Sequence, residues 1–122
     1  MAKVLIVDDD PYIAEMYLIK FKEAGFEVTS AANGRQALEE MQTFRPDVVL
    51  LDIIMPIYDG YEVLKRMKER GDLARIKVII LSNLGQKEDI EKGLALGAVD
   101  YVIKAHFTPS EVVEKVKSVL NS

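Results

Sequence analysis

The chain has 122 residues, 49% of them hydrophobic and 30% charged, and this length and composition predict one soluble globular domain, residues 1–122. The formal net charge of −4 provides no basic surface for nucleic acid, and the chain contains no cysteine for disulfides. It has no apolar run long enough to cross a membrane and no signal-peptide pattern at the N-terminus, so we expect a cytoplasmic protein without a membrane contact.

Five short apolar segments alternate with five helical patterns along the chain. Strands are predicted at residues 3–7, 26–30, 47–51, 77–81 and 99–103. The strands are apolar on both faces, which is typical of a parallel sheet covered by helices on both sides. The predicted fold class is therefore α/β, a three-layer sandwich of one five-stranded sheet and five helices.

Capping residues and apolar stripes place three of the helices. Asp10 and Pro11 start the first helix and Gly25 ends it. Its predicted inner stripe is Ile13, Met16, Tyr17, Phe21 and Ala24. Asp59 and Thr108 are each followed three residues later by glutamate, the pattern of a capping box at the start of the third and fifth helices.

The second and fourth helices differ in their predicted strength. The second is predicted over residues 35–44. The fourth lies around Ile90, is interrupted by Gly93 and ends at Gly97. Its low helix propensity makes it a candidate for mobility.

Polar residues follow the predicted strands, at the edge where parallel strands end together and ligands bind. These residues are Asp8, Asp9 and Asp10 after the first strand, Asp52 after the third, Ser82 after the fourth and Lys104 after the fifth. Clustered carboxylates repel one another, so protonation or a hard cation should partly neutralise them. Mg²⁺ is the best candidate, because it takes oxygen ligands and leaves positions open for water and phosphate oxygens.

A magnesium ion beside a carboxylate, with a lysine and a serine nearby, suits phosphoryl transfer to that carboxylate. Lys104 would neutralise charge on the phosphoryl oxygens, and the Ser82 hydroxyl would donate a hydrogen bond. Asp52 is the best nucleophile because it stands alone on its strand, whereas clustered aspartates are better used as metal ligands.

The spacing of these residues resembles, over the whole chain, the receiver domain of two-component response regulators. The motifs that carry the resemblance are Val7-Asp8-Asp9, Leu51-Asp52, Met55-Pro56 with Asp59-Gly60, Ser82 and Lys104. Their spacing taken together is highly specific. The resemblance implies the flavodoxin-like strand order 2-1-3-4-5, in a single-domain protein similar to the chemotaxis regulators.

The resemblance also implies a signalling function in a phosphorelay. Asp52 would be phosphorylated by a sensor histidine kinase, a phosphotransfer protein or a small phosphodonor. Asp9, Asp52 and the backbone carbonyl of Ile54 would hold Mg²⁺, and Asp8 would act mainly through a bound water. Such a protein promotes only its own phosphorylation and dephosphorylation and is not otherwise an enzyme.

A switch is implied as well. Ser82 would move to the phosphoryl group, and Tyr101 would rotate inward into the vacated space. The output surface would comprise the fourth helix, fifth strand and fifth helix, which would bind a downstream target protein. The resemblance also allows a phosphorylation-dependent dimer.

Some positions depart from the usual family pattern. Ala105 follows Lys104 where the family has a proline in a cis bond, so we expect a trans bond and a reshaped loop. Asn83 replaces a small residue and would either narrow access to the phosphoryl group or add a hydrogen bond to it. Ile54 and Leu84 cannot orient an attacking water, which predicts a long-lived phosphoryl group.

Two other functions compete with this interpretation. A phosphatase similar to the haloacid dehalogenases would use Asp8 and Asp10 as a catalytic pair, although the chain has no room for a cap domain and Asp10 looks like a helix cap. A degenerate receiver would bind partners without phosphorylation, which the departures at Asn83 and Ala105 would favour.

Overall fold

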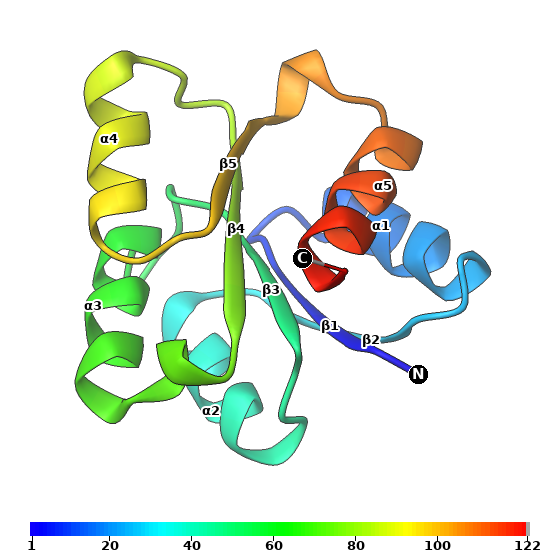
Figure 1. The fold of residues 1–122 in the computed structure, drawn as a ribbon, viewed down its shortest axis with the longest axis horizontal. Helices are drawn as coiled ribbons and strands as arrows, with labels where there is room; N and C mark the ends of the chain where they lie inside the picture. Colours follow the sequence, from blue (N-terminus) through cyan, green and yellow to red (C-terminus); the bar gives the residue numbers. More distant parts are fainter. Residues whose placement is uncertain (122) are drawn as a thin grey trace.

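The computed structural model describes residues 1–121, in which five strands and five α-helices alternate along the chain (Figure 1). The strands are β1 (Lys3–Val7), β2 (Glu27–Ala31), β3 (Val48–Leu51), β4 (Lys77–Ser82) and β5 (Asp100–Ile103). The helices are α1 (Pro11–Glu23), α2 (Gly34–Thr43), α3 (Gly60–Arg70), α4 (Lys87–Ala95) and α5 (Pro109–Leu120), with short 3₁₀ turns η1 (Asp72–Ala74) and η2 (Lys104–His106). The five strands and α2, which were predicted as residue ranges, are present with ends that differ by at most one residue, and α1 and α4 end two residues before Gly25 and Gly97.

The strands form one parallel sheet in the order β2-β1-β3-β4-β5, which confirms the predicted topology. The order reverses at β1, which has β2 on one side and β3 on the other. Val7 and Leu51 are the last paired residues of β1 and β3, so Asp8 and Asp52 follow side by side. This is the switch point at which sheets of this class bind ligands.

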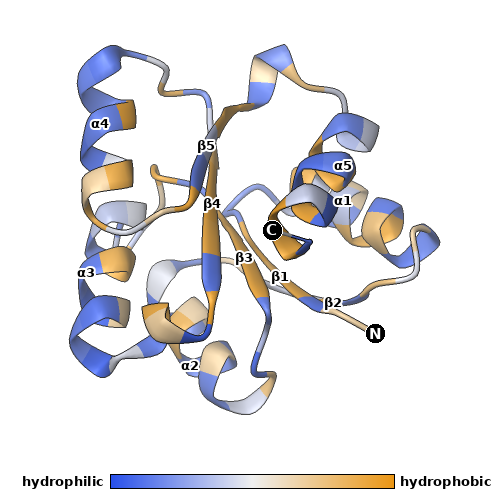
Figure 2. Ribbon diagram, viewed as in Figure 1, coloured by the Kyte–Doolittle hydropathy of each residue, from blue (hydrophilic) through white to orange (hydrophobic). Residues whose placement is uncertain are grey.

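Helices cover both faces of the sheet and enclose two apolar cores. In Figure 1, α1 and α5 lie on one face, and α2, α3 and α4 on the other. Val4 and Ile6 of β1 pack on the α1 and α5 side, whereas Leu5 and Val7 pack on the opposite side. Figure 2 shows the strands as a hydrophobic centre between helices with hydrophilic outer parts. Within residues 1–121, no helix combines the length and hydrophobicity that crossing a membrane requires.

Two of the predicted helix caps form as expected. The Asp10 carboxylate accepts the backbone N–H groups of Tyr12 and Ile13 at 2.9 and 3.3 Å. At the start of α5, the Thr108 hydroxyl accepts the Glu111 N–H while the Glu111 carboxylate accepts the Thr108 N–H. Both helices therefore begin at the residues that satisfy their free N–H groups.

Two local predictions about the helices are wrong. Asp59 accepts the Glu62 N–H at 2.9 Å, but the Glu62 side chain does not complete the capping box. It pairs instead with Arg66, one turn further along α3, at 3.0 Å. The predicted inner stripe of α1 is also wrong at two positions: Met16, 41% exposed, and Ala24 are exposed, and the buried residues of the helix are Ala14, Tyr17 and Phe21.

Gly93 does not interrupt α4, contrary to the prediction. The helix spans Lys87–Ala95 without a break at Gly93, and Gly93 is buried. A Cβ atom at this position would lie 2.3 Å from Cδ1 of Ile80 and 3.3 Å from Cδ2 of Tyr101. The glycine is needed because the backbone of α4 lies directly against β4 and β5.

Candidate functional site

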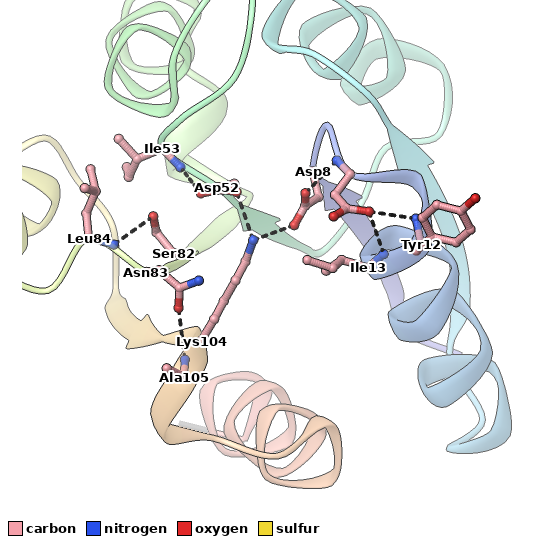
Figure 3. Close-up of polar contacts among 11 residues, drawn as sticks. Asp8, Tyr12, Ile13, Asp52, Ile53, Ser82, Asn83, Leu84, Lys104 and Ala105 are labelled. Carbon is pink, nitrogen blue, oxygen red and sulfur yellow. Dashed lines mark hydrogen bonds and ion pairs between the residues drawn. The ribbon is translucent and has the colours of Figure 1, made fainter.

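The carboxyl ends of β1, β3, β4 and β5 bring the predicted polar residues together (Figure 3). Asp8 is 4% exposed, Asp52 8% and Ser82 1%, although none of these residue types is usually buried. Lys104 directly follows β5 as the first residue of η2. The sheet topology thus collects, at one edge, groups that are far apart in the sequence.

Lys104 joins the two buried carboxylates. Its Nζ atom lies 2.6 Å from Oδ2 of Asp8 and 2.9 Å from Oδ2 of Asp52. Burial by itself would lower the pKa of Lys104, but the hydrogen bonds to Asp8 and Asp52 and their negative charges outweigh burial, so the pKa is raised. The side chain therefore stays an ammonium ion at neutral pH.

Backbone N–H groups orient the second oxygen of each carboxylate. Oδ1 of Asp8 accepts the Asp10 N–H at 2.9 Å, and Oδ1 of Asp52 accepts the Ile53 N–H at 2.7 Å. Each carboxylate is therefore held by an N–H group on one oxygen and by the ammonium ion on the other. This arrangement reduces the freedom of Asp52 to rotate before a reaction.

Asp8, Asp9 and Asp52 form an acidic cluster whose nearest oxygens all lie within 4.8 Å of one another. Asp9 is exposed, so the cluster is open to solvent on one side. A set of carboxylate oxygens without nitrogen or sulfur suits a hard divalent cation. Ile54 is exposed in the loop that follows β3, and the metal contact of its carbonyl stays a prediction.

The Asp59-Gly60 motif supports the backbone of Asp52. The Gly60 N–H donates to the Ile53 carbonyl oxygen at 2.8 Å, which closes the loop between β3 and α3. A Cβ atom on Gly60 would lie 2.5 Å from the Asp52 carbonyl oxygen. Only glycine allows the start of α3 to approach Asp52 this closely.

Ser82 and Tyr101 both contact the loop between β4 and α4. The Ser82 hydroxyl accepts the Leu84 N–H at 3.3 Å, and the Tyr101 hydroxyl donates to the Leu84 carbonyl oxygen at 2.5 Å. Burial, above all, raises the pKa of Tyr101 to about 12. The phenol is therefore neutral and able to donate over the physiological pH range.

Two departures from the family pattern, Asn83 and Ala105, contact each other. The Lys104–Ala105 peptide bond is trans, as expected, and the chain continues into η2. The Ala105 N–H donates to Oδ1 of Asn83 at 3.0 Å (Figure 3). A proline at position 105 would lack this N–H. The sequence therefore indicated that the Ala105 N–H is available as a donor. It did not indicate the acceptor, the Asn83 side chain, which is 22 residues away.

Asp10 is the one residue of the predicted strand-end set that does not face the site. Its side-chain oxygen caps α1, as described above, and its backbone N–H orients Asp8. A catalytic pair of Asp8 and Asp10, as in the phosphatase alternative, would require the Asp10 carboxylate to leave the helix. The cap therefore argues against that alternative.

Comparisons with known proteins agree with this geometry. The family model described as the response regulator receiver domain matches residues 4–117. The probable transcriptional regulator ycf27 of Cyanophora paradoxa is 39% identical over 118 residues, which cover 97% of this chain and 48% of ycf27. The chain thus spans about half the length of the curated relatives it matches.

Solved structures show the same fold over nearly the whole chain. A crystal structure of the chemotaxis protein CheY4 from Vibrio cholerae has a TM-score of 0.90 and 34% identity, covering 98% of both chains. The receiver domain of the Francisella response regulator 1452 has a TM-score of 0.89 and 37% identity, covering 96% of this chain and 94% of its own.

Proposed function

The chain belongs to the response regulator receiver domain family of two-component signalling, and from this premise we propose that Asp52 is its phosphoacceptor. Residues 1–122 are taken as one receiver domain. The phosphoryl group would come from a sensor histidine kinase, a phosphotransfer protein or a small phosphodonor. The observation that carries the proposal is the position of Asp52, buried at the end of β3, 2.9 Å from the Lys104 ammonium and inside the acidic cluster.

The acidic cluster fits a magnesium ion. Asp9 and Asp52, with the backbone carbonyl of Ile54, would hold the ion, and Asp8 would act mainly through a bound water. When bound, the ion supplies positive charge to the phosphoryl oxygens during transfer. The three carboxylates carry three formal negative charges and Lys104 only one positive charge, so the site has a charge reason to take a divalent cation.

The chain's own groups have distinct tasks in the transfer. A carboxylate oxygen of Asp52 forms the new bond to phosphorus, while the bond from phosphorus to the donor breaks and its electron pair stays on the donor's imidazole nitrogen or acetate oxygen. The Lys104 ammonium ion, which pairs with the Asp52 carboxylate before the transfer, would pair with the negatively charged phosphoryl oxygens after it. The Ser82 hydroxyl would give up its hydrogen bond from the Leu84 N–H and donate a hydrogen bond to the phosphoryl group instead.

The switch would then travel through the loop between β4 and α4. Ser82 and Tyr101 both contact Leu84 in this loop, so a movement of Ser82 changes the surroundings of the Tyr101 hydroxyl. Gly93 lies against the Tyr101 ring, which links the loop to α4. The surface of α4, β5 and α5 would present the result to a downstream target protein or to a second phosphorylated copy.

The phosphoryl group should persist for longer than seconds. Ile54 is exposed beside the site and Leu84 lies half-buried in the neighbouring loop. Neither side chain has a polar group that could orient a water for attack on the phosphoryl group. Hydrolysis within seconds in buffer containing magnesium would contradict this expectation.

Intact mass after incubation with magnesium and acetyl phosphate tests the proposal. We expect the mass of one phosphoryl group to be added to the wild-type chain and to Asp47→Asn, and not to Asp52→Asn. Asp47 is a matched control because it accepts the Lys3 N–H at the opposite edge of the sheet.

Other outcomes would overturn the proposal. Equal labelling of Asp52→Asn would show that Asp52 is not the acceptor. Continuous turnover of added phosphate esters would favour the phosphatase. A chain that binds its partners but takes up no phosphoryl group would be a phosphorylation-independent binding module.

A further inference from the structure

The hydrogen bond between Asn83 and Ala105 brackets two residues of the site. Asn83 directly follows Ser82, and Ala105 directly follows Lys104. The Ala105 N–H donates to Oδ1 of Asn83 at 3.0 Å. A restraint between these neighbours therefore acts on the relative positions of the Ser82 hydroxyl and the Lys104 ammonium ion.

The bond lies just beyond the last paired residues of β4 and β5. The ladder between these strands ends at the pair Ser82 and Ile103. Beyond this pair the two segments separate: the segment after β4 leads to α4, and the segment after β5 leads into η2. The Asn83 side chain supplies an acceptor where the strands no longer provide a backbone carbonyl. It thereby adds one hydrogen bond between the two segments beyond the end of the strand pairing.

A second bond fixes the same loop to β5. The Tyr101 hydroxyl donates to the Leu84 carbonyl oxygen, so two consecutive loop residues are each bonded to β5 or to the turn after it. The Tyr101 ring also packs near Gly93 of α4. The loop between β4 and α4 is therefore restrained by hydrogen bonds at two consecutive residues, Asn83 and Leu84.

We propose that Asn83 is a positioning residue, which holds Ser82 and Lys104 in place about Asp52 through its bond to the Ala105 N–H. This inference rests on the proposed function, because the reaction it serves is the phosphorylation of Asp52. Because position 105 is alanine and not proline, its N–H is available as a donor, and Asn83 accepts it and so restrains the loop. The Asn83 oxygen is occupied by the bond to the Ala105 N–H, so the role proposed for this side chain is indirect.

A double-mutant cycle isolates this bond. Asn83→Ala removes the acceptor, Ala105→Pro removes the donor, and the double variant lacks both. We expect Asn83→Ala to slow labelling of the chain by acetyl phosphate by about three- to tenfold, the range set by one hydrogen bond. In the Ala105→Pro background the same substitution should have no effect, because no bond remains to be lost.

Asn33→Ala is the matched control. Asn33 also uses its side-chain oxygen to accept a backbone N–H, that of Gln36 at 2.8 Å, but at the start of α2. This variant should lose stability without a change in labelling rate. An equal slowing by Asn33→Ala and Asn83→Ala would show a general effect of stability and overturn the positioning role. So would an effect of Asn83→Ala that is unchanged in the Ala105→Pro background.

Hydrogen exchange at the Ala105 amide tests the restraint without phosphorylation, and needs no proline variant. We expect exchange of this amide to be faster in Asn83→Ala than in the wild-type chain by about three- to tenfold. Unchanged exchange would overturn the inference even if Asp52 is labelled. Faster exchange in a chain that takes up no phosphoryl group would support the restraint and overturn only the proposed function.

Discussion

Two clusters of charged groups, each with at least one buried carboxylate, have opposite charge balances. At the carboxyl edge of the sheet, Asp8, Asp9 and Asp52 face one cation, Lys104. At the end of α3, Asp72 alone faces two cations. The first cluster has an excess of two negative charges (three minus one), and the second an excess of one positive charge (two minus one).

In the cluster around Asp72, the charged groups pair with one another. Asp72 is 2% exposed, and its two oxygens pair with Arg70 at 2.6 Å and Arg75 at 3.1 Å. Arg70 also donates to the Leu38 carbonyl oxygen at 3.2 Å, which ties α3 to α2. Direct hydrogen bonds therefore occupy both carboxylate oxygens, and the cluster has a structural role.

The first cluster leaves charge without a partner. Lys104 reaches one oxygen each of Asp8 and Asp52, and Asp9 extends toward solvent. Repulsion among three carboxylates is unfavourable for folding unless a ligand relieves it. Burial of a charge therefore does not by itself distinguish the proposed site from the Asp72 cluster, whereas the charge balance does.

Lys104→Met should have the largest effect, because it removes the cation that pairs with two of the three carboxylates of the unbalanced cluster. We expect the rate of labelling by acetyl phosphate to fall by about 10²- to 10³-fold, the cost of losing one strong group that stabilises charge in the transition state. The measurement is intact mass against time.

Lys77→Met is the control for this prediction. Lys77 donates to the Val119 carbonyl oxygen from the start of β4, at the opposite edge of the sheet. Its labelling rate should match that of the wild-type chain. A normal rate for Lys104→Met would mean that the ammonium ion has only a structural role, as the arginines around Asp72 have.

Asp72→Ala should have the complementary effect. The variant leaves both arginines without their carboxylate and should lower the free energy of unfolding by about 1–3 kcal/mol, measured by urea denaturation. Labelling of the folded chain should be unchanged. A clear loss of labelling at full folding would break the distinction between the two clusters.

The pH dependence of Tyr101 is the smallest expected effect, and Asp52 of the unbalanced cluster contributes to it only after burial, Tyr61 and Asp89. Burial raises the pKa of Tyr101 from 10.0 to about 12, and the negative charges of Tyr61, Asp89 and, least of the three, Asp52 add to the shift. Because the folded state keeps the proton longer than the unfolded state, the contribution to stability is fully present below pH 10.0 and is lost as the pH rises through about 12.

Tyrosinate absorbance during an alkaline titration measures this pKa, with Tyr101→Phe identifying the signal. In Asp52→Asn the pKa of Tyr101 should be lower than in the wild-type chain, whereas in Asp72→Ala it should be unchanged. An ordinary pKa for Tyr101 in the wild-type chain would contradict the burial of its hydroxyl.

Much of the fold could be predicted because its signals are local. The β-branched strands, the Asp10 and Thr108 caps and the inner residues of α2 depend on neighbours within a few positions. The errors occur where distant contacts override local preference. Gly93 reads as a weak point in a helix, but its place against Ile80 and Tyr101 makes it a point of close packing.

The set of polar groups at the site could be predicted from the sequence, because parallel strands end at one edge and the residues after them meet there. From that rule come Asp8, Asp9, Asp52, Ser82 and Lys104, together with the oxygen ligand set. The tertiary structure decided which of these groups pair. It placed Lys104 between Asp8 and Asp52, turned Asp10 away as a cap, and joined Asn83 to Ala105.

The physical reason is the short range of hydrogen bonds and ion pairs. Their strength depends on distances of about 3 Å and on donor direction, which no spacing in a sequence specifies. A strand pattern predicts the edge at which a side chain emerges, but only the packed backbone determines which neighbour it reaches.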